Sequence, residues 1–302
     1  MESEKLSTTR KREIALKLRI YVSSFSSQKK ACTSLHDVSE ATVLCMIGEK
    51  EFCWDAISDA MWRNVAKQVG EVANFNSLVE TQNFHTLNLY FDLARDEGAT
   101  FAIIGNAGWG KSYTAKWYSA VNRKNNVYYM ECAEYWNKKK FLQYLLLQMG
   151  KNGAGMGTAE LMESILREMR RQNKPLIIMD EIDKLPDPVL KFFITLYNEL
   201  NKICGFVWLS TNAIEKRIKM GLDKNTIGYH ELYSRVGASF ISLNMPSVDE
   251  ISEICKENGI SDKEKVALIV NEVRQIGGDL RRVDRNILKD KIKTMRKKLK
   301  AA

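Results

Sequence analysis

The sequence predicts an α/β fold with a parallel sheet, flanked by helical segments at both ends. Three observations lead to this prediction. Residues 89–245 alternate short apolar runs with helical runs, a pattern typical of parallel strands joined by crossover helices. A glycine-rich segment, Gly105 to Ser112, follows the first apolar run. Two carboxylates, Asp180 and Glu181, end a later apolar run.

The 302 residues have room for two or three domains with a core of ordinary size. We expect a helical domain over 1–70, a connector over 71–88 rich in Asn, Thr and Ser, an α/β core over 89–245, and a helical lid over 246–302. The strand candidates of the core are the runs 99–105, 125–132, 175–180, 205–211 and 238–244.

The first segment predicts a small helical bundle. Residues 12–25 carry apolar residues at a helical period, which are Ile14, Leu18, Tyr21, Val22 and Phe25. Two short helices are expected over 26–35 and 38–49, on either side of a break at His36 and Asp37. Ser39 is the expected N-cap of the second, because its hydroxyl can accept a hydrogen bond from a free backbone N–H.

These two short helices resemble a helix-turn-helix, whose second helix would meet DNA bases through Glu40, Ala41 and Thr42. The negative charge of Glu40 weakens the case for tight DNA binding, so a plain helical interaction domain stays open. A further helix over Trp54 to Gly70 would close the bundle. Its inward residues are expected to be Ile57, Met61, Trp62 and Val65.

The segment GNAGWGKS fits G-x-x-x-x-G-K-[ST], the phosphate-binding loop of nucleoside triphosphatases. Small residues let backbone N–H groups surround phosphate oxygens, and the N-terminus of the following helix favours negative charge. We expect Lys111 to reach the β- and γ-phosphates and the Ser112 hydroxyl to ligate Mg²⁺. The expected nucleotide-contacting residues are Gly105, Asn106, Ala107, Gly108, Trp109, Gly110, Lys111, Ser112 and Tyr113.

The apolar run LIIM, residues 176–179, predicts a buried parallel strand that ends in Asp180 and Glu181. Open α/β sheets bind their ligands at the carboxyl ends of the strands. Asp180 is therefore placed to hold Mg²⁺, through water, and Glu181 to orient and deprotonate an attacking water. The sequence has no N-K-x-D motif for reading guanine, which favours ATP over GTP.

Three further residues complete the expected site. Asn212 follows a strand and can hydrogen-bond the γ-phosphate or the attacking water, although Asn is also an ordinary turn residue there. Arg235, just before the last strand, can act in trans as a finger on a neighbouring subunit's γ-phosphate, or can be a surface arginine. Arg281 and Arg282 follow a Gly-Gly turn, and one of them can fold back onto the phosphates.

Charge and composition suggest the kind of partner. The net charge is +9, and residues 281–300 carry ten Lys or Arg against two Asp, a net charge of +8. This stretch predicts a surface for the phosphates of duplex DNA with little sequence preference; a solvated tail is the alternative. No apolar run approaches the roughly 18 residues of a membrane span, and the N-terminus lacks an apolar signal core, so we expect a cytoplasmic protein with no membrane contact. Six scattered cysteines without a C-x-x-C pair are expected to be reduced.

The ordered set GNAGWGKS, IIMDEID, LSTN, LYSRVG and GGDLRR resembles the AAA+ ATPases. Among these, the segment LVETQNF, residues 78–84, and the N-terminal helices resemble the target-DNA-capture ATPases of transposing phages of the Mu type. The resemblance implies ATP and Mg²⁺ as cofactors, a homo-oligomer that forms helical filaments on duplex DNA, and a transposase as partner that stimulates hydrolysis.

The same resemblance implies roles for individual residues. Asn212 would be the sensor near the γ-phosphate, Arg235 the trans finger and Arg281 the sensor of the lid. Trp109 departs from the family pattern, because small residues are usual at its place in the loop; we expect its side chain to point outward. Three other functions stay open: a helicase loader or replication initiator, an ATP-switched helix-turn-helix regulator of transcription, and a nucleotide-gated scaffold with little turnover.

Overall fold

The computed structural model describes residues 6, 8–23, 28–33, 35–48, 51–69, 78–122 and 126–301. The chain divides into two compact units. The α/β unit consists of Glu80–Pro246 with Arg274–Leu280, and the helical unit of Met1–Val79, Ser247–Val273 and Arg281–Ala302. The sheet and the glycine-rich loop both lie in the α/β unit. The four segment boundaries expected from the sequence stay predictions.

The α/β unit is built on a five-stranded parallel sheet with the strand order β2-β3-β4-β1-β5. The strands are β1 (Thr100–Ile104), β2 (Val127–Glu131), β3 (Leu176–Asp180), β4 (Gly205–Ser210) and β5 (Ile241–Ser242). All five expected strands are therefore confirmed. Every residue of β3 and β4 is buried, as expected for central strands of a parallel sheet that is covered on both faces.

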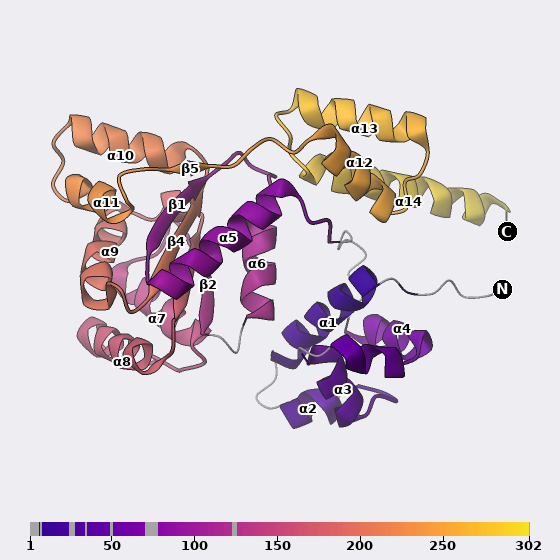
Figure 1. Cartoon of the computed structure of the whole chain (residues 1–302), viewed down its shortest axis with the longest axis horizontal. Coiled ribbons are helices and arrows are strands. Elements are labelled where there is room, and N and C mark those ends of the chain that lie inside the picture. The colour runs from indigo at the N-terminus through magenta and orange to yellow at the C-terminus, as the bar shows by residue number, and fades with distance from the viewer. Residues whose placement is uncertain are drawn as a thin grey trace. The chain divides into compact units, whose positions relative to one another are not determined.

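Helices cover both faces of the sheet (Figure 1). On one face, α5 (Gln82–Glu97) and α6 (Lys111–Val121) pack on Leu176 and Ile178 of β3. On the other, Ile177 and Met179 pack against helices of the second layer. These are α7 (Lys138–Gln148), α8 (Thr158–Arg171), α9 (Asp187–Leu200), α10 (Ala213–Asp223) and α11 (Tyr229–Arg235). Neighbouring residues of a strand point to opposite faces, which explains why each strand contributes to both cores.

The strand order brings the candidate site residues to one edge of the sheet. Ile104, the last residue of β1, pairs with Ser210, the last residue of β4. Asp180, at the end of β3, pairs with Leu209 of β4 and with Glu131 of β2. The loop after β1 and the carboxylates after β3 therefore share the carboxyl edge of the sheet.

Helix α5 occupies the end of the segment that the sequence suggested as a connector. Its N-cap is Thr81, whose hydroxyl oxygen accepts a hydrogen bond from the N–H of Phe84 at 3.2 Å. Leu87 and Phe91 of this helix are fully buried in the sheet core. Hydrophobic burial and an N-cap thus outweigh the polar composition of this stretch, while residues 70–77 lie outside the described part of the chain.

The N-terminal part of the helical unit has its own hydrophobic core. Its helices are α1 (Thr8–Ser23), α2 (Gln28–Thr33), α3 (Glu40–Ile47), the 3₁₀ helix η1 (Glu51–Ala56) and α4 (Asp59–Gln68). Ser39 caps α3 as expected, accepting from the N–H of Thr42 at 3.1 Å. The outward position expected for Glu40 and Ala41 is also found, whereas Thr42 is half-buried.

One helix of this bundle differs from its expected bounds. The helix expected over Trp54 to Gly70 begins only at Asp59, because the hydroxyl oxygen of Ser58 accepts a hydrogen bond from the N–H of Met61 and caps it there. Trp54 lies before that cap, in η1, and its ring packs edge-on against Trp62 at a centroid distance of 5.2 Å. The expected inward residues do pack: Trp62 and Val65 are fully buried, and Ile57 and Met61 partly. Phe25 lies outside the described residues.

The C-terminal part is helical throughout, as expected. It contains α12 (Val248–Glu257), α13 (Lys263–Gln275) and α14 (Arg281–Ala301). Ser247 and Glu250 form a capping box that starts α12. The basic stretch predicted from the sequence forms α14, of which the side chains of residues 291 and 294–300 lie outside the described part.

Two expectations about composition can be compared with the described residues. Cys32, Cys45, Cys132, Cys204 and Cys255 are free thiols, as expected. Within the described ranges, no helix combines the length and the apolar character that crossing a bilayer requires.

Candidate functional site

The loop between β1 and α6 has the backbone geometry of a phosphate cradle. Gly105 donates its N–H to the carbonyl of Ser210 at 3.1 Å, which ties the start of the loop to β4. Gly108 and Gly110 have φ of +78° and +84°, the left-handed region that favours glycine. Gly110 is the N-cap of α6, so the loop ends at a helix N-terminus whose first N–H groups lack intrahelical partners.

Lys111 is the first residue of α6, and its side chain is held by the loop itself. Its Nζ donates to the carbonyl oxygens of Gly105 at 2.6 Å and of Asn106 at 2.8 Å. The residue is only 8% exposed. The ammonium group is therefore held within the turn of the loop, where a positive charge suits an anionic ligand.

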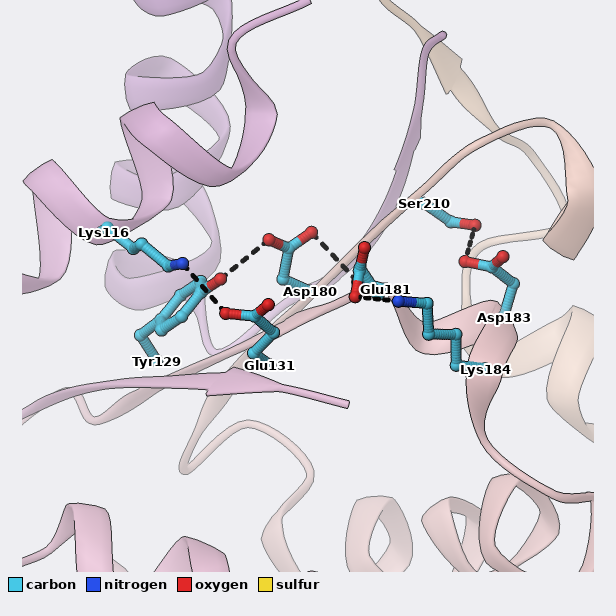
Figure 2. A network of polar contacts seen from close by, with 8 residues as sticks. All are labelled: Lys116, Tyr129, Glu131, Asp180, Glu181, Asp183, Lys184 and Ser210. Carbon is cyan, nitrogen blue, oxygen red and sulfur yellow. Dashed lines mark hydrogen bonds and ion pairs between the residues drawn. The ribbon is translucent and has the colours of Figure 1, made fainter. Parts of the chain in front are cut away.

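Asp180 is the most buried carboxylate of the site, with 1% of its surface exposed. Its oxygens accept hydrogen bonds from the hydroxyl of Tyr129 at 2.8 Å and from the N–H of Glu181 at 2.9 Å (Figure 2). Burial raises the pKa of Asp180. The nearby Ser112 side chain and the hydrogen bonds from Tyr129 and Glu181 act in the opposite direction.

Ser112 and Asp180 are thus brought together from two motifs that lie far apart in the sequence. A hydroxyl and a carboxylate are hard oxygen donors that suit Mg²⁺, which keeps several waters and takes other ligands from phosphates. Within the described residues, no group of three or more His, Cys, Asp and Glu side chains is placed to hold a metal ion. The donor set fits an ion shared with a nucleotide better than an ion in an all-protein cage.

Glu181 adopts an unusual backbone conformation, with φ 54° and ψ 39°, as the N-cap of the 3₁₀ helix η3 (Ile182–Lys184). This turn directs its side chain to Lys184, and the two form an ion pair (Figure 2). The hydrogen bond to Glu181 raises the pKa of Lys184. About a third of the Glu181 side chain is exposed, so water reaches the carboxylate next to buried Asp180.

The structure adds polar residues that the sequence analysis missed. The Ser210 hydroxyl donates to Asp183 at 2.6 Å, and Lys116 pairs with Glu131 at 2.9 Å (Figure 2). Tyr129, on β2, donates the hydrogen bond to Asp180 described above. Its position two residues before the end of a strand beside β3 is the only sequence signal that would have suggested it.

The three outlying site residues have different surroundings. Asn212 is exposed at the start of α10, two residues after the Ser210 carbonyl that holds the loop, and makes no capping hydrogen bond. Arg235 donates to the side-chain oxygen of Asn198 on α9 at 3.0 Å and lies over the ring of Tyr197. Arg281 is exposed and belongs to the helical unit. The sensor and finger roles of these residues stay predictions.

Trp109 does not point outward, so that expectation is wrong. Its indole Nε1–H donates to the carbonyl oxygen of Gly277 at 2.8 Å. The ring is partly buried against the core that contains Leu87 and Leu243. The Gly277 carbonyl thus provides the acceptor that an indole N–H removed from water usually finds.

Comparison with known proteins finds a similarity for the middle of the chain. Residues 94–218 match the family model described as AAA domain. This match and the five-stranded parallel sheet confirm the predicted α/β fold, that of an AAA+ ATPase with a phosphate-binding loop. The match supports nucleotide binding and ATPase chemistry in general for this part. A comparison with curated proteins gave no match.

Three solved structures show distant similarity. The structure titled Drosophila ORC bound to DNA is 17% identical, covers 67% of this chain and 52% of its own, and has a TM-score of 0.44. The Thermotoga maritima RuvB Holliday junction branch migration motor is 16% identical, with 68% and 59% covered and a TM-score of 0.42. NtrX from Brucella abortus in complex with ATP is 12% identical, with 78% and 58% covered and a TM-score of 0.46. The chain spans between about half and three fifths of these proteins.

Proposed function

We propose that this chain is an ATPase that binds duplex DNA in an ATP-dependent manner, assembles on it, and presents it to a transposase. The observation that carries the ATPase part is the strand pairing that brings the loop with Lys111 and Ser112 to the same edge of the sheet as Asp180 and Glu181. It unites the phosphate loop and the carboxylates of β3 in one site, which is the arrangement that phosphoryl transfer requires.

In the proposed reaction, Lys111 leaves the loop carbonyls and binds the β- and γ-phosphates of ATP. Glu181 orients a water molecule and accepts its proton as the water oxygen attacks the γ-phosphorus. The bond from that phosphorus to the bridging oxygen breaks, giving ADP and inorganic phosphate. Ser112, directly, and Asp180, through water, would hold Mg²⁺, which would supply positive charge to offset the negative charge of the phosphate oxygens.

The ion pair with Lys184 bears on the role of Glu181. One carboxylate oxygen of Glu181 accepts a hydrogen bond from Lys184, so Glu181 must turn away from Lys184 before that oxygen can receive the proton of a water molecule. The Glu181–Lys184 pair is partly exposed to solvent and its members are three residues apart, so separating them costs at most about 1 kcal/mol. The base is therefore available to ATP without a large rearrangement.

Support for the DNA part comes from the distribution of charge. The net charge of +8 in residues 281–300 suits the phosphates of DNA, which bind Lys and Arg largely without regard to base sequence. Support for target capture comes from the resemblance of residues 78–84 and of the N-terminal helices to the capture ATPases of transposing phages. In the proposed assembly, Asn212 senses the γ-phosphate, Arg235 reaches the ATP of a neighbouring copy, and Arg281 senses nucleotide in its own chain.

The first test is electron-microscope imaging of the full chain with random-sequence duplex DNA, with and without ATP and Mg²⁺. We expect filaments along the DNA only when ATP is present, and none for Lys111→Ala, which lacks the phosphate-binding ammonium. Lys151→Ala, a lysine outside the site whose partner is Glu168, serves as the control and is expected to form filaments. Discrete rings, or binding at one sequence only, would instead favour a helicase loader or a transcription regulator.

A further inference from the structure

Two residues in the phosphate loop are not explained by phosphate binding. The motif G-x-x-x-x-G-K-[ST] specifies Gly105, Gly110, Lys111 and Ser112, and leaves the four positions between the glycines open. At two of these open positions the chain has Gly108 and Trp109. Both contact the turn over residues 277–280, about 170 residues further along the chain.

Trp109 is fastened to the turn through its side chain. The indole Nε1–H donates to the carbonyl oxygen of Gly277 at 2.8 Å, a full-strength hydrogen bond. Space on both sides of the ring is restricted: a Cβ on Gly105 would lie 3.1 Å from Cε3, and a Cβ on Gly278 would lie 3.0 Å from Nε1. The ring therefore fits between two glycines, one in the loop and one in the turn.

Gly108 is fastened to the same turn through its backbone. Its carbonyl oxygen accepts a hydrogen bond from the N–H of Leu280 at 3.2 Å. A Cβ at position 108 would lie 1.8 Å from a carboxylate oxygen of Asp279, so no other residue fits without moving that side chain. The φ of +78° adds a second reason for glycine.

Helix α5 contacts the loop at the backbone carbonyl of Trp109. Asn83, in the first turn of α5 and 4% exposed, exchanges hydrogen bonds with the backbone of Asn244, at 2.7 Å and 3.1 Å. Its amide nitrogen also lies 3.4 Å from the carbonyl oxygen of Trp109. The loop is thus in contact with α5 and with the 277–280 turn, and α5 is joined in turn to the segment after β5.

From these contacts we propose that Trp109 is a positioning residue that makes the phosphate loop and the 277–280 turn move as one body. Nucleotide phosphates that bind the loop N–H groups would then reposition the turn, and with it Arg281, the next residue along the chain. This inference rests on the proposed nucleotide site and adds the route by which occupancy of that site reaches α14.

The loop and the turn are expected to move together because the contacts between them are short and directional. One is made by the side chain of Trp109 and the other by the backbone of Gly108. Two hydrogen bonds and the fitted ring leave the loop no room to shift by an ångström without breaking a contact to the turn. A loop with only small residues would lack the hydrogen bond from the indole to Gly277. Phosphate binding to such a loop would then change the position of the turn less. The bulky residue at position 109 therefore has a role other than binding nucleotide.

The test is hydrogen–deuterium exchange of the full chain, read from peptides that cover residues 276–282, with and without saturating ATP. ATP binding to each variant is measured separately with a fluorescent analogue, so that exchange is compared at equal occupancy. In the unaltered chain we expect ATP to slow exchange in these peptides by about tenfold. In Trp109→Phe, which keeps an aromatic ring but lacks the N–H donor, we expect less than about twofold slowing.

The matched control is Trp117→Phe, because Trp117 lies on α6 and packs against Phe84 rather than the turn. It is expected to respond to ATP like the unaltered chain. If Trp109→Phe does not fold, Asp279→Ala removes the side chain that packs against Gly108, leaves the loop sequence intact, and is also expected to reduce the response.

Outcomes separate the two proposals. A turn that responds to ATP equally with and without the indole N–H would overturn the coupling and leave the nucleotide site standing. Binding of ATP with no change in the turn of the unaltered chain would also overturn it. Failure of the unaltered chain to bind ATP at all would instead overturn the proposed function, and the coupling with it.

Discussion

Asp180 illustrates how a single residue is placed for binding at a cost to stability. Burial raises its pKa, which means that folding favours the protonated form over the ionised one. Above the folded pKa, the ionised carboxylate therefore lowers the stability of the fold. The hydrogen bonds from Tyr129 and from the N–H of Glu181 offset part of this cost.

We predict that Asp180→Asn raises the melting temperature of the nucleotide-free protein by a few degrees at pH 7. The neutral amide avoids burying a charge and keeps hydrogen-bonding atoms near Tyr129 and Glu181. Because the native pKa is raised, the difference from the unaltered chain is full above that pKa and shrinks as the pH falls through it. Calorimetry between pH 4 and 8 measures this, and a melting temperature equal to or below that of the unaltered chain at pH 7 would contradict it.

For Glu181 we predict that Glu181→Gln retains ATP and DNA binding but lowers the hydrolysis rate by a factor of about 10²–10⁴. The amide keeps the shape of the side chain but cannot accept the proton of the attacking water, so the assembly on DNA is trapped. Steady-state phosphate release and filament lifetime are the measurements. The same change at Glu215, which pairs with Lys219 on α10, is the control. Loss of DNA binding in Glu181→Gln would show that the assigned role is wrong.

At the scale of elements, helix ends and strand ends define the site. The N-terminus of α6 completes the loop, and the ends of β1, β3 and β4 bring the loop and the carboxylates together. The N-terminus of α5 is anchored by Asn83, which joins this helix to the segment after β5. A buried amide that satisfies backbone groups of another element fixes the position of the helix.

We predict that Asn83→Ala lowers the free energy of unfolding by about 2–3 kcal/mol, because it removes a buried amide together with both of its hydrogen bonds to the backbone of Asn244. Urea unfolding followed by circular dichroism measures it. Asn88→Ala on the same helix is the control, since the Asn88 amide bonds only the Phe84 carbonyl one turn earlier. Equal effects of the two changes would mean that the contact to Asn244 contributes little.

At the scale of the whole molecule, the proposed assembly requires residues that serve a neighbouring copy. Arg235 points to Asn198 and Tyr197 of its own chain, and no hydrogen bond or ion pair of the described structure joins it to the phosphate loop. An arginine held in a fixed direction at the end of a helix suits a role in trans.

We predict that Arg235→Ala leaves ATP binding by the isolated chain intact and lowers hydrolysis in the DNA-bound assembly by about 10³-fold or more. Mixing this variant with Lys111→Ala tests the role further. In a mixed assembly, an Arg235→Ala subunit keeps an intact nucleotide site and can lie beside a Lys111→Ala subunit that keeps an intact Arg235. Arg170→Ala, an exposed arginine paired with Glu199, is the control. Full activity of a monomeric Arg235→Ala protein would exclude the trans finger.

The basic helix gives a second prediction at this scale. Replacing the exposed Arg285, Lys289 and Lys293 of α14 by Gln should weaken binding to all DNA sequences alike. The slope of log affinity against log salt should fall by up to about 3, near 0.9 for each lost phosphate contact. Fluorescence anisotropy across salt concentrations measures the slope. The same three changes at Arg167, Arg170 and Arg171 of α8 serve as the control, and equal slopes for both triple variants would contradict a special role of α14.

The sequence by itself was enough for the features that depend on local physics. The five strands, the loop and helix α6, the cap at Ser39 and the carboxylates after β3 each follow from apolar period, capping chemistry or glycine within about ten residues. The start of α4 was missed because the expected helix over Trp54 to Gly70 runs through Ser58, and only the structure shows that the Ser58 hydroxyl accepts the N–H of Met61 and caps the helix there.

Only the tertiary structure decided which distant residues meet the site. The Tyr129 hydroxyl reaches Asp180 across 51 residues of sequence, and the indole of Trp109 reaches Gly277 across 168. Neither contact leaves a local pattern, because hydrogen bonds between side chains and distant segments depend on how the strands are ordered and the helices packed. Sequence therefore determined the chemistry that the loop and the carboxylates offer, and packing determined how buried, oriented and connected those groups are.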